Sequence, residues 1–427
     1  TCALPICETM KKLIALLLSM LLMVAVFAPS VAEEQIVIKL SCAASEQEKI
    51  SCEQTVARFE EKYPNVKVEA EYYAGLSWDE IIQKQLVEFA AGTQADVVYI
   101  AIEGTHLMVE YDLFQPITDL IEANKDYFAE VPQSAFDAFK VGDEYYEVPF
   151  NCNDMAIAYN TEMFDAIGVK PGKWTAQEYL DALGKIDAKY NTPETPITEK
   201  VWGTVIGETP YLWMAAFGAS VLNEDWTASN MKDPAVREVL QYLYDLVHVY
   251  GYAPVREANT DDTALFCSGR VASIFTGPYV LSSFEANNFD TWNVAIGPRG
   301  SEKGRAAYGV GGLGMMASCK HREEAFNLMK EFCSIETSMT QAREATSLPL
   351  FESAANSPEF LSHCEDMHIF YDELPDAIKL PSPVCYAELN MIMKDMMNNI
   401  MTQTLTIDEA IEKADAEITE AFAEFGY

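Results

Sequence analysis

The residue pattern that most restricts the fold is an alternation of short apolar segments with capped amphipathic helices. Residues 35–40, 66–70 and 96–102 have the β-branched, apolar character of buried strands. Between them lie two capping boxes, Ser45-x-x-Glu48 and Ser77-x-x-Glu80, which mark helix starts. This strand–helix–strand–helix–strand order predicts an α/β fold in which helices cover both faces of a sheet.

The same signals return later in the chain. Helix starts are predicted at Thr175-x-x-Glu178, at Asp233 before Pro234, and at Thr406-x-x-Glu409. No repeat of 20–50 residues and no low-complexity linker separates these units. A two-lobed α/β protein without a flexible tether therefore fits the 427 residues best.

The amino-terminal residues predict export. Lys11 and Lys12 precede the apolar run Leu13–Ala28, and Ser30-Val31-Ala32 supplies the small residues of a cleavage site. We therefore expect residues 10–32 to be a signal peptide and the protein to act in the periplasm or outside the cell. Residues 1–9 resemble an artefactual or upstream extension, and we exclude them from the fold.

The net charge of the chain narrows the class of partner that it can bind. The chain carries 29 basic and 66 acidic residues, a net charge of −37. Nucleic acids and anionic membranes are bound by clustered Lys and Arg, so we expect neither partner.

Eight of the ten cysteines follow residue 32, and none forms a C-x-x-C pair. In an exported protein some of them can form disulfides, and the sequence leaves the pairing open.

Motifs for catalysis or cofactors are weak. Gly309–Gly314 matches G-x-G-x-x-G, but apolar residues continue after it where dinucleotide binding requires a helix start. We interpret these glycines as a close backbone approach, between strands or against a ligand. The histidines have no standard metal-ligand spacing. We predict no catalytic residue, no metal site and no cofactor.

Aromatic residues beside Gly, Pro or polar residues give the more informative signal. They include Trp202, Tyr211, Trp213, Tyr279 and Tyr386. Exposed rings stack on the apolar faces of sugars, while Asp, Glu and Asn take hydrogen bonds from hydroxyl groups. As a set in predicted loops, they favour a neutral polyol ligand.

Six segments in order resemble the maltose-binding-like family, the extracellular sugar-binding proteins of ABC importers. The segments are Phe59–Val68, Glu88–Val98 (similar to "AAG-x-x-PDVV", with Ala95 for Pro), Gly142–Pro149, Ala158–Phe164, Lys173–Glu178, and Phe266–Ala272 followed by Gly277-Pro278-Tyr279. Tyr279 stands where the family has Trp. The resemblance covers almost the whole chain after the predicted signal peptide.

The resemblance implies a periplasmic-binding-protein-like fold, with two α/β lobes, a hinge and a ligand cleft between the lobes. It implies an N-lobe of residues 33–148 plus 277–318 and a C-lobe of residues 149–276 plus 319–427. The implied protein is a monomer and not an enzyme. It binds a mono- or oligosaccharide and delivers it to the transmembrane subunits of an ABC permease.

Site residues are predicted from their positions in this arrangement. Tyr279 would stack on the sugar, Tyr211 and Trp213 are further aromatic candidates, and Gly311 and Gly312 would let the backbone approach the ligand. The polar and remaining aromatic candidates are Ser45, Glu46, Glu103, Asn151, Asp154 and Tyr386.

Two alternatives stay open. A secreted carbohydrate-active hydrolase or lyase with a pair of carboxylates would turn over its glycan. The same receptor fold could instead bind a peptide, a polyamine or another cation, which the acidity of the chain makes worth testing.

Overall fold

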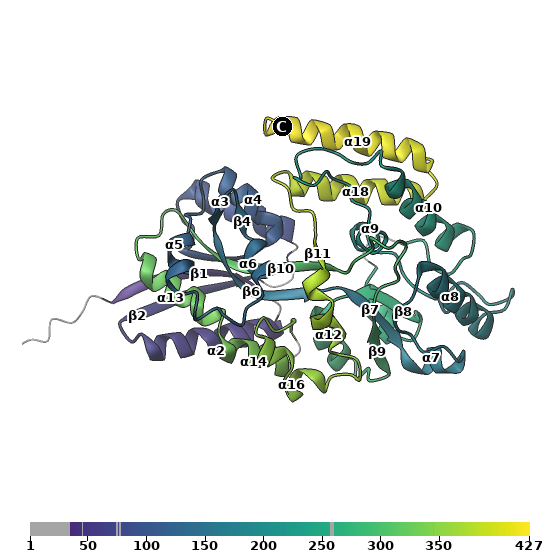
Figure 1. Ribbon diagram of the computed structural model, residues 1–427, viewed down its shortest axis with the longest axis horizontal. Helices are drawn as coiled ribbons and strands as arrows, with labels where there is room; N and C mark the ends of the chain where they lie inside the picture. Colours follow the sequence, from purple (N-terminus) through teal and green to yellow (C-terminus); the bar gives the residue numbers. More distant parts are fainter. Residues whose placement is uncertain (1–34, 45, 74–75, 77, 257–259, 345) are drawn as a thin grey trace, which may run out of the picture.

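The computed structural model describes residues 35–427, apart from residues 45, 74–75, 77, 257–259 and 345. Two lobes lie side by side, one built on a six-stranded sheet and the other on a three-stranded sheet (Figure 1). The predicted extension and signal peptide lie outside the described residues. Within the described part, no helix is long and apolar enough to cross a membrane.

The first lobe, or N-lobe, is organised by β1 and β10. Its strands are β1 (Ile36–Ala43), β2 (Val66–Tyr73), β3 (Val97–Ala101), β6 (Glu147–Asp154), β10 (Ala307–Met315) and β11 (Ile378–Lys379), with a small hairpin of β4 (Lys140–Val141) and β5 (Glu144–Tyr145). The sheet order is β11-β10-β3-β1-β2, and β6 pairs with the other edge of β10. β1 is parallel to β2 and β3, whereas β10 is antiparallel to β3 and β6.

Helices cover both faces of this sheet, as the alternating pattern predicts. They are α2 (Glu46–Lys62), α3 (Trp78–Ala91), α4 (Ile102–Glu110), α5 (Thr118–Ala123), α6 (Gln133–Asp137), α13 (Arg322–Phe332) and α14 (Ile335–Glu344). Short helices follow: α15 (Glu352–Ala355), α16 (Pro358–Leu361), α17 (Ile369–Asp372) and the 3-10 turn η2 (Leu374–Asp376).

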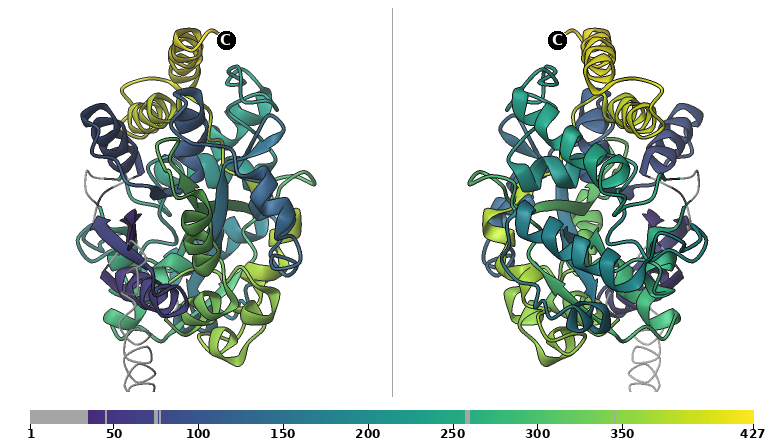
Figure 2. Two further views of the ribbon diagram at one scale, coloured as in Figure 1. Left: turned by 90° about the vertical axis from the view of Figure 1, so that its left-hand side faces the viewer. Right: turned by 90° about the vertical axis from the view of Figure 1, so that its right-hand side faces the viewer.

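The second lobe, or C-lobe, contains an antiparallel sheet in the order β8-β7-β9. The strands are β7 (Ala156–Asn160), β8 (Ser273–Thr276) and β9 (Trp292–Ala295). Its helices are α7 (Thr161–Ala166), α8 (Ala176–Tyr190), α9 (Tyr211–Phe217), α10 (Pro234–His248), α11 (Asp262–Cys267), the 3-10 turn η1 (Pro278–Val280), α12 (Leu281–Ala286), α18 (Tyr386–Met401) and α19 (Ile407–Glu424). Helices α18 and α19 run together beside α10, at the end of the molecule that carries the C-terminus (Figure 2).

Local sequence signals account for several element ends. Thr175 and Thr406 each form a complete capping box with the Glu three residues later, and Asp233 caps α10. The three predicted helix starts are confirmed. Gly92, just after α3, has a φ of 69°, the left-handed conformation that favours glycine at the end of a helix. The glycine-rich motif at 309–314 lies inside β10 and opens no helix, as the interpretation of a close approach between strands requires.

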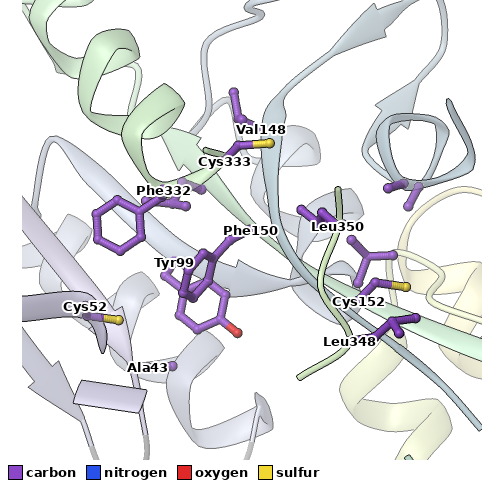
Figure 3. Packing of buried hydrophobic residues seen from close by; sticks show 14 of the residues in the cluster. Ala43, Cys52, Tyr99, Val148, Phe150, Cys152, Phe332, Cys333, Leu348 and Leu350 are labelled. Carbon is purple, nitrogen blue, oxygen red and sulfur yellow. The ribbon is translucent and has the colours of Figure 1, made fainter. Parts of the chain in front are cut away.

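Apolar packing continues across the crossover between lobes. One buried cluster covers a face of the first sheet, including Tyr99, Phe150 and Phe332 (Figure 3), and it extends to Ala156 and Ile274 on the second. A second cluster fills the other side of the C-lobe between its sheet and α10, α18 and α19. The lobes are therefore tied at the crossover by continuous packing.

The division of the chain between the lobes differs from the predicted boundaries in several segments. Residues 149–154 of β6 and residues 378–379 of β11 join the N-lobe sheet beside β10. Residues 278–295 stay with the C-lobe, because β9 pairs with β7 through Ile157 and Ala295. Helices α13 and α14 return to the N-lobe and pack on α2. Glu331 of α13 (5% exposed) forms ion pairs with two residues of α2, Arg58 at 3.2 Å and Lys62 at 2.8 Å. Helix and strand spacing alone could not assign these segments to a lobe.

Candidate functional site

The two lobes meet where α3 and α4 face α9 and α18. Asp79 lies in the first turn of α3, and Asn390 lies on α18 of the other lobe. The Asn390 Nδ2 donates a hydrogen bond to Asp79 Oδ2 at 3.0 Å. This bond joins the two lobes directly.

Three buried polar atoms at this contact lack a hydrogen-bond partner within the described residues. They are Asp79 Oδ1, Glu103 Oε2 and Tyr211 Oη. Glu103 comes from the start of α4, at the carboxyl end of β3, and Tyr211 starts α9 on the other lobe and is 8% exposed. A buried polar atom left unpaired costs about 1–3 kcal/mol, so this grouping indicates a place for a ligand.

Burial also sets the protonation of these groups. Burial, with a smaller contribution from the charge of Asp79, raises the pKa of Glu103 to about 7. Burial raises the pKa of Tyr211 and Tyr386 above their ordinary values, and the charges of Glu103 and Asp79 add to the effect. Both phenols keep their protons, so Tyr211 offers a donor beside carboxylates that accept.

A cavity of about 460 Å³ adjoins this grouping on the C-lobe. The start of α9 joins the two, because Leu212 and Trp213 line the cavity, with Thr209 just before the helix, while Tyr211 lies with the carboxylates. Tyr279 forms another wall with 47% of its surface exposed, and its ring lies near Met155 at the crossover between lobes. A half-exposed ring beside polar groups is the arrangement that stacks on a sugar.

Acidic and hydroxyl groups complete the lining of the cavity. Asp261, Asp262, Thr263 and Thr276 all contribute. The nearby cations are neutralised: Arg256 is paired with Asp262, and Lys394 with Glu208 at 3.2 Å. The combined surface favours a ligand that carries hydrogen-bond donors and no negative charge.

A second contact between the lobes lies farther along α4. The His106 ring lies 6.0 Å from the Trp226 ring of the C-lobe, and Lys379 Nζ lies 4.4 Å from the centre of the same ring. Burial lowers the pKa of His106 to about 4, with help from the Lys379 charge, and burial lowers the pKa of Lys379 to about 8.

Of the predicted site residues, the structure brings three together at the interlobe contact and two, Tyr279 and Trp213, to the adjoining cavity. Glu103, Tyr211 and Tyr386 belong to the contact. Trp213 is only 2% exposed and packs against Phe275 at 5.4 Å between ring centres. It therefore supports the cavity wall and offers no free face for stacking.

Four other predicted residues make contacts within the protein. They are Asn151, Asp154, Gly311 and Gly312. Asn151 (5% exposed) donates to the Tyr99 hydroxyl at 2.8 Å and accepts from the Gly311 N–H at 3.0 Å. Asp154 is 1% exposed and accepts from the Met155 N–H.

The two predicted glycines of β10 lie close against side chains of the N-lobe. A Cβ at Gly311 would lie 2.7 Å from Tyr99, and one at Gly312 would lie 2.6 Å from Phe139. The structure thus gives them a packing role in place of the predicted ligand approach. Ser45 lies outside the described residues, and Glu46 begins α2, with its side chain outside the description as well.

Sequence reasoning missed Asp79 and Asn390. In the sequence, Asp79 stood out only as part of the predicted capping box at residues 77–80, and this pattern gives no sign of a contact with the other lobe. Asn390 follows Tyr386 by four residues on α18, so the two share a helix face. That spacing is the signal that could have found Asn390. Within the described residues, no group of three His, Cys, Asp or Glu side chains is placed to hold a metal ion.

Comparison with known proteins identifies the family to which the chain belongs. A model of the family of bacterial extracellular solute-binding proteins matches residues 54–365. The chain belongs to this family. A Brucella abortus protein named as a binding protein is 23% identical over 381 residues, covering 85% of this chain and 89% of its own length.

Solved structures share the two-lobed fold. The ABC substrate-binding protein of Listeria monocytogenes, in complex with cycloalternan, matches with a TM-score of 0.80, 21% identity and coverage of 91% of this chain and 99% of that chain. An ABC transporter solute-binding protein of Thermotoga lettingae, bound to α-D-tagatose, matches with a TM-score of 0.76, 21% identity and coverage of 91% and 100%. These relatives are binding proteins, and at this identity they show the fold.

Proposed function

We propose that this solute-binding protein is the receptor of an ABC importer and holds a neutral mono- or oligosaccharide between its lobes. The observation that carries the proposal is the convergence of Asp79, Glu103 and Tyr211, whose buried oxygens lack partners within the described residues. Sugar hydroxyls both donate and accept, so one sugar edge can satisfy two carboxylate oxygens and one phenol together. The exposed Tyr279 ring supplies the apolar half of the recognition.

The direct contact between lobes supports a mechanism of closure. Groups from α3 and α4 on one lobe and from α9 and α18 on the other reach the same point, so a ligand held there bridges both lobes. Its binding energy favours the closed state, and the closed state presents both lobes to the permease. Delivery to the transmembrane subunits, with no chemical change to the sugar, follows from this role.

The neutral ligand class follows from charge. The carboxyl oxygens of Asp79 and Glu103 accept hydrogen bonds, whereas a uronate or a sugar phosphate would place a like charge beside Asp79 and beside the ionised form of Glu103. The relatives bound to cycloalternan and α-D-tagatose add support, since both ligands are carbohydrates.

Thermal unfolding in the presence of a carbohydrate panel tests the proposal. The panel contains pentoses, hexoses, hexitols, linear and cyclic oligosaccharides, a uronate and a polyamine. A ligand at about 100 times its Kd stabilises the protein by about 2.7 kcal/mol, which gives a clear upward shift. A shift with a neutral saccharide is expected, and no shift with any carbohydrate contradicts the proposal.

Two controls separate binding from its alternatives. Tyr279→Ala should remove most of the shift, while Tyr111→Ala, which truncates a tyrosine 52% exposed at the far end of α4, should keep it. After incubation of the protein with the bound saccharide, a reducing-end assay should detect no new reducing ends, because a receptor leaves its ligand intact. Release of new reducing ends would favour the hydrolase alternative, and a shift with the polyamine alone would favour a cationic solute.

A further inference from the structure

Two cysteines of the N-lobe lie with their sulfur atoms in contact. Cys42 lies in β1 and Cys52 in α2, and their Sγ atoms are 3.5 Å apart. Both side chains are 0% exposed. Figure 3 shows Cys52 in the buried cluster on the side where Ala43, the residue after Cys42, also lies. The pair is fully shielded from reagents in the folded protein.

The backbones that carry this pair are held in place by the sheet. Cys42 lies opposite Tyr72 of β2 and Tyr99 of β3, so β1 is fixed on both edges at this position. α2 packs on β2, α13 and α14. A disulfide bond has an S–S distance of about 2.05 Å, so the two sulfur atoms need to approach by about 1.5 Å to bond.

The surroundings of the two thiols keep them unreactive in the folded protein. The hydrogen bond with Cys52 and burial raise the pKa of Cys42 well above its ordinary value, so the folded protein holds no reactive thiolate there. Exchange chemistry requires a thiolate, and oxidation must therefore precede burial, while the chain folds.

We propose that Cys42 and Cys52 form an intramolecular disulfide bond when the protein folds outside the cytoplasm. Each thiol loses its proton, and the two sulfurs together give up two electrons as the S–S bond forms. The electrons and protons pass to an oxidant disulfide, either of a cell-envelope protein or of a small molecule, which is reduced to two thiols. Disulfides persist in that compartment, where this family acts.

The bond would brace the N-lobe edge of the site. It closes the loop from the end of β1 to the first half of α2, next to β3, whose carboxyl end leads into Glu103. Closing this loop removes freedom from the unfolded chain, so oxidation raises the midpoint of thermal unfolding. The inference does not depend on which solute the site binds.

Oxidative refolding followed by peptide mapping tests the proposal. The protein is denatured and reduced, refolded in a buffer of reduced and oxidised glutathione, and then alkylated with N-ethylmaleimide in guanidinium chloride without reductant. Six of the eight cysteines of the described residues should be alkylated, and a peptide linking Cys42 to Cys52 should appear. Alkylation of both Cys42 and Cys52, or a link from either to another cysteine, overturns the proposal.

Thermal unfolding of variants supplies the second readout. Reductant should lower the midpoint of the wild-type protein by a few °C. The double variant Cys42→Ala/Cys52→Ala should be insensitive to reductant. Cys152→Ala/Cys333→Ala, which removes two other cysteines, each 1% exposed, from the same cluster, should stay sensitive. Equal sensitivity of the Cys42→Ala/Cys52→Ala protein contradicts the assignment.

Discussion

The carboxyl group of Glu103 couples the stability of this protein to pH. Its Oε2 atom is buried without a partner within the described residues, and its pKa is raised to about 7 from an ordinary value of 4.5. Replacing Glu103 with Gln removes the charge and keeps the shape of the side chain. The change should therefore stabilise the free protein at alkaline pH and have little effect at acid pH.

The sign follows from proton binding. With a higher pKa in the folded state, the folded protein binds more protons than the unfolded chain, so stability falls as pH rises from about 4.5 to about 7. The full shift corresponds to about 3.4 kcal/mol, at 1.36 kcal/mol per pKa unit. Between pH 5 and pH 8 the part that Glu103 loses is about 2.5 kcal/mol.

His106 acts in the opposite direction over part of this range. Its pKa is lowered to about 4 from 6.5, so the unfolded chain binds more protons and stability rises with pH between those values. The two effects partly cancel in the wild-type protein. The difference in unfolding free energy between Glu103→Gln and wild type removes the His106 contribution and isolates Glu103.

Urea unfolding followed by circular dichroism at pH 5 and pH 8 measures this difference. The stability of Glu103→Gln relative to wild type should increase by about 2.5 kcal/mol from pH 5 to pH 8. Glu110→Gln, at the exposed end of the same helix, should show no such increase. An increase below about 1 kcal/mol would refute the burial of the Glu103 carboxyl group in the free protein.

Three further substitutions separate structural from ligand-binding roles. Tyr279→Ala should change stability by less than about 1 kcal/mol, because the side chain is 47% exposed, yet weaken saccharide binding at least about tenfold by calorimetry. Trp213→Ala should cost about 3–5 kcal/mol in urea unfolding, because its ring is 2% exposed and packed; a loss under about 1 kcal/mol would contradict this packing. His106→Asn should gain about 2 kcal/mol of stability relative to wild type from pH 8 to pH 5, because the unfolded variant has no histidine to take up a proton there; the same pH dependence in both proteins would show that His106 is solvated.

Local signals predicted much of the secondary structure. Capping boxes such as Thr175 with Glu178 act within one helical turn, so their outcome depends little on the rest of the chain. The α/β class followed from the same alternation. The sequence pattern favoured two lobes, but their boundaries came from the family resemblance, because nothing local specifies which sheet a strand such as β9 joins.

The site was predicted only in part, for physical reasons. Glu103 follows a buried strand, and side chains at carboxyl ends of strands face the ligand edge in α/β folds, so its position was predictable. Asp79 and Asn390 meet across the lobes although 311 residues separate them in the chain, and no periodicity reports such a contact. Trp213 was expected to be exposed because it stands near Gly and Pro, but tertiary packing buried it.

The most direct test of the account is a crystal structure of the protein grown with the saccharide that gives the largest thermal shift. The account predicts sugar density between the lobes, with a ring face on Tyr279 and hydroxyl groups within hydrogen-bond distance of Glu103, Asp79 and Tyr211. Density instead in the separate cavity lined by Lys173, Arg299 and Glu373 would contradict it. So would an interlobe site that stays empty at a saturating concentration of the saccharide.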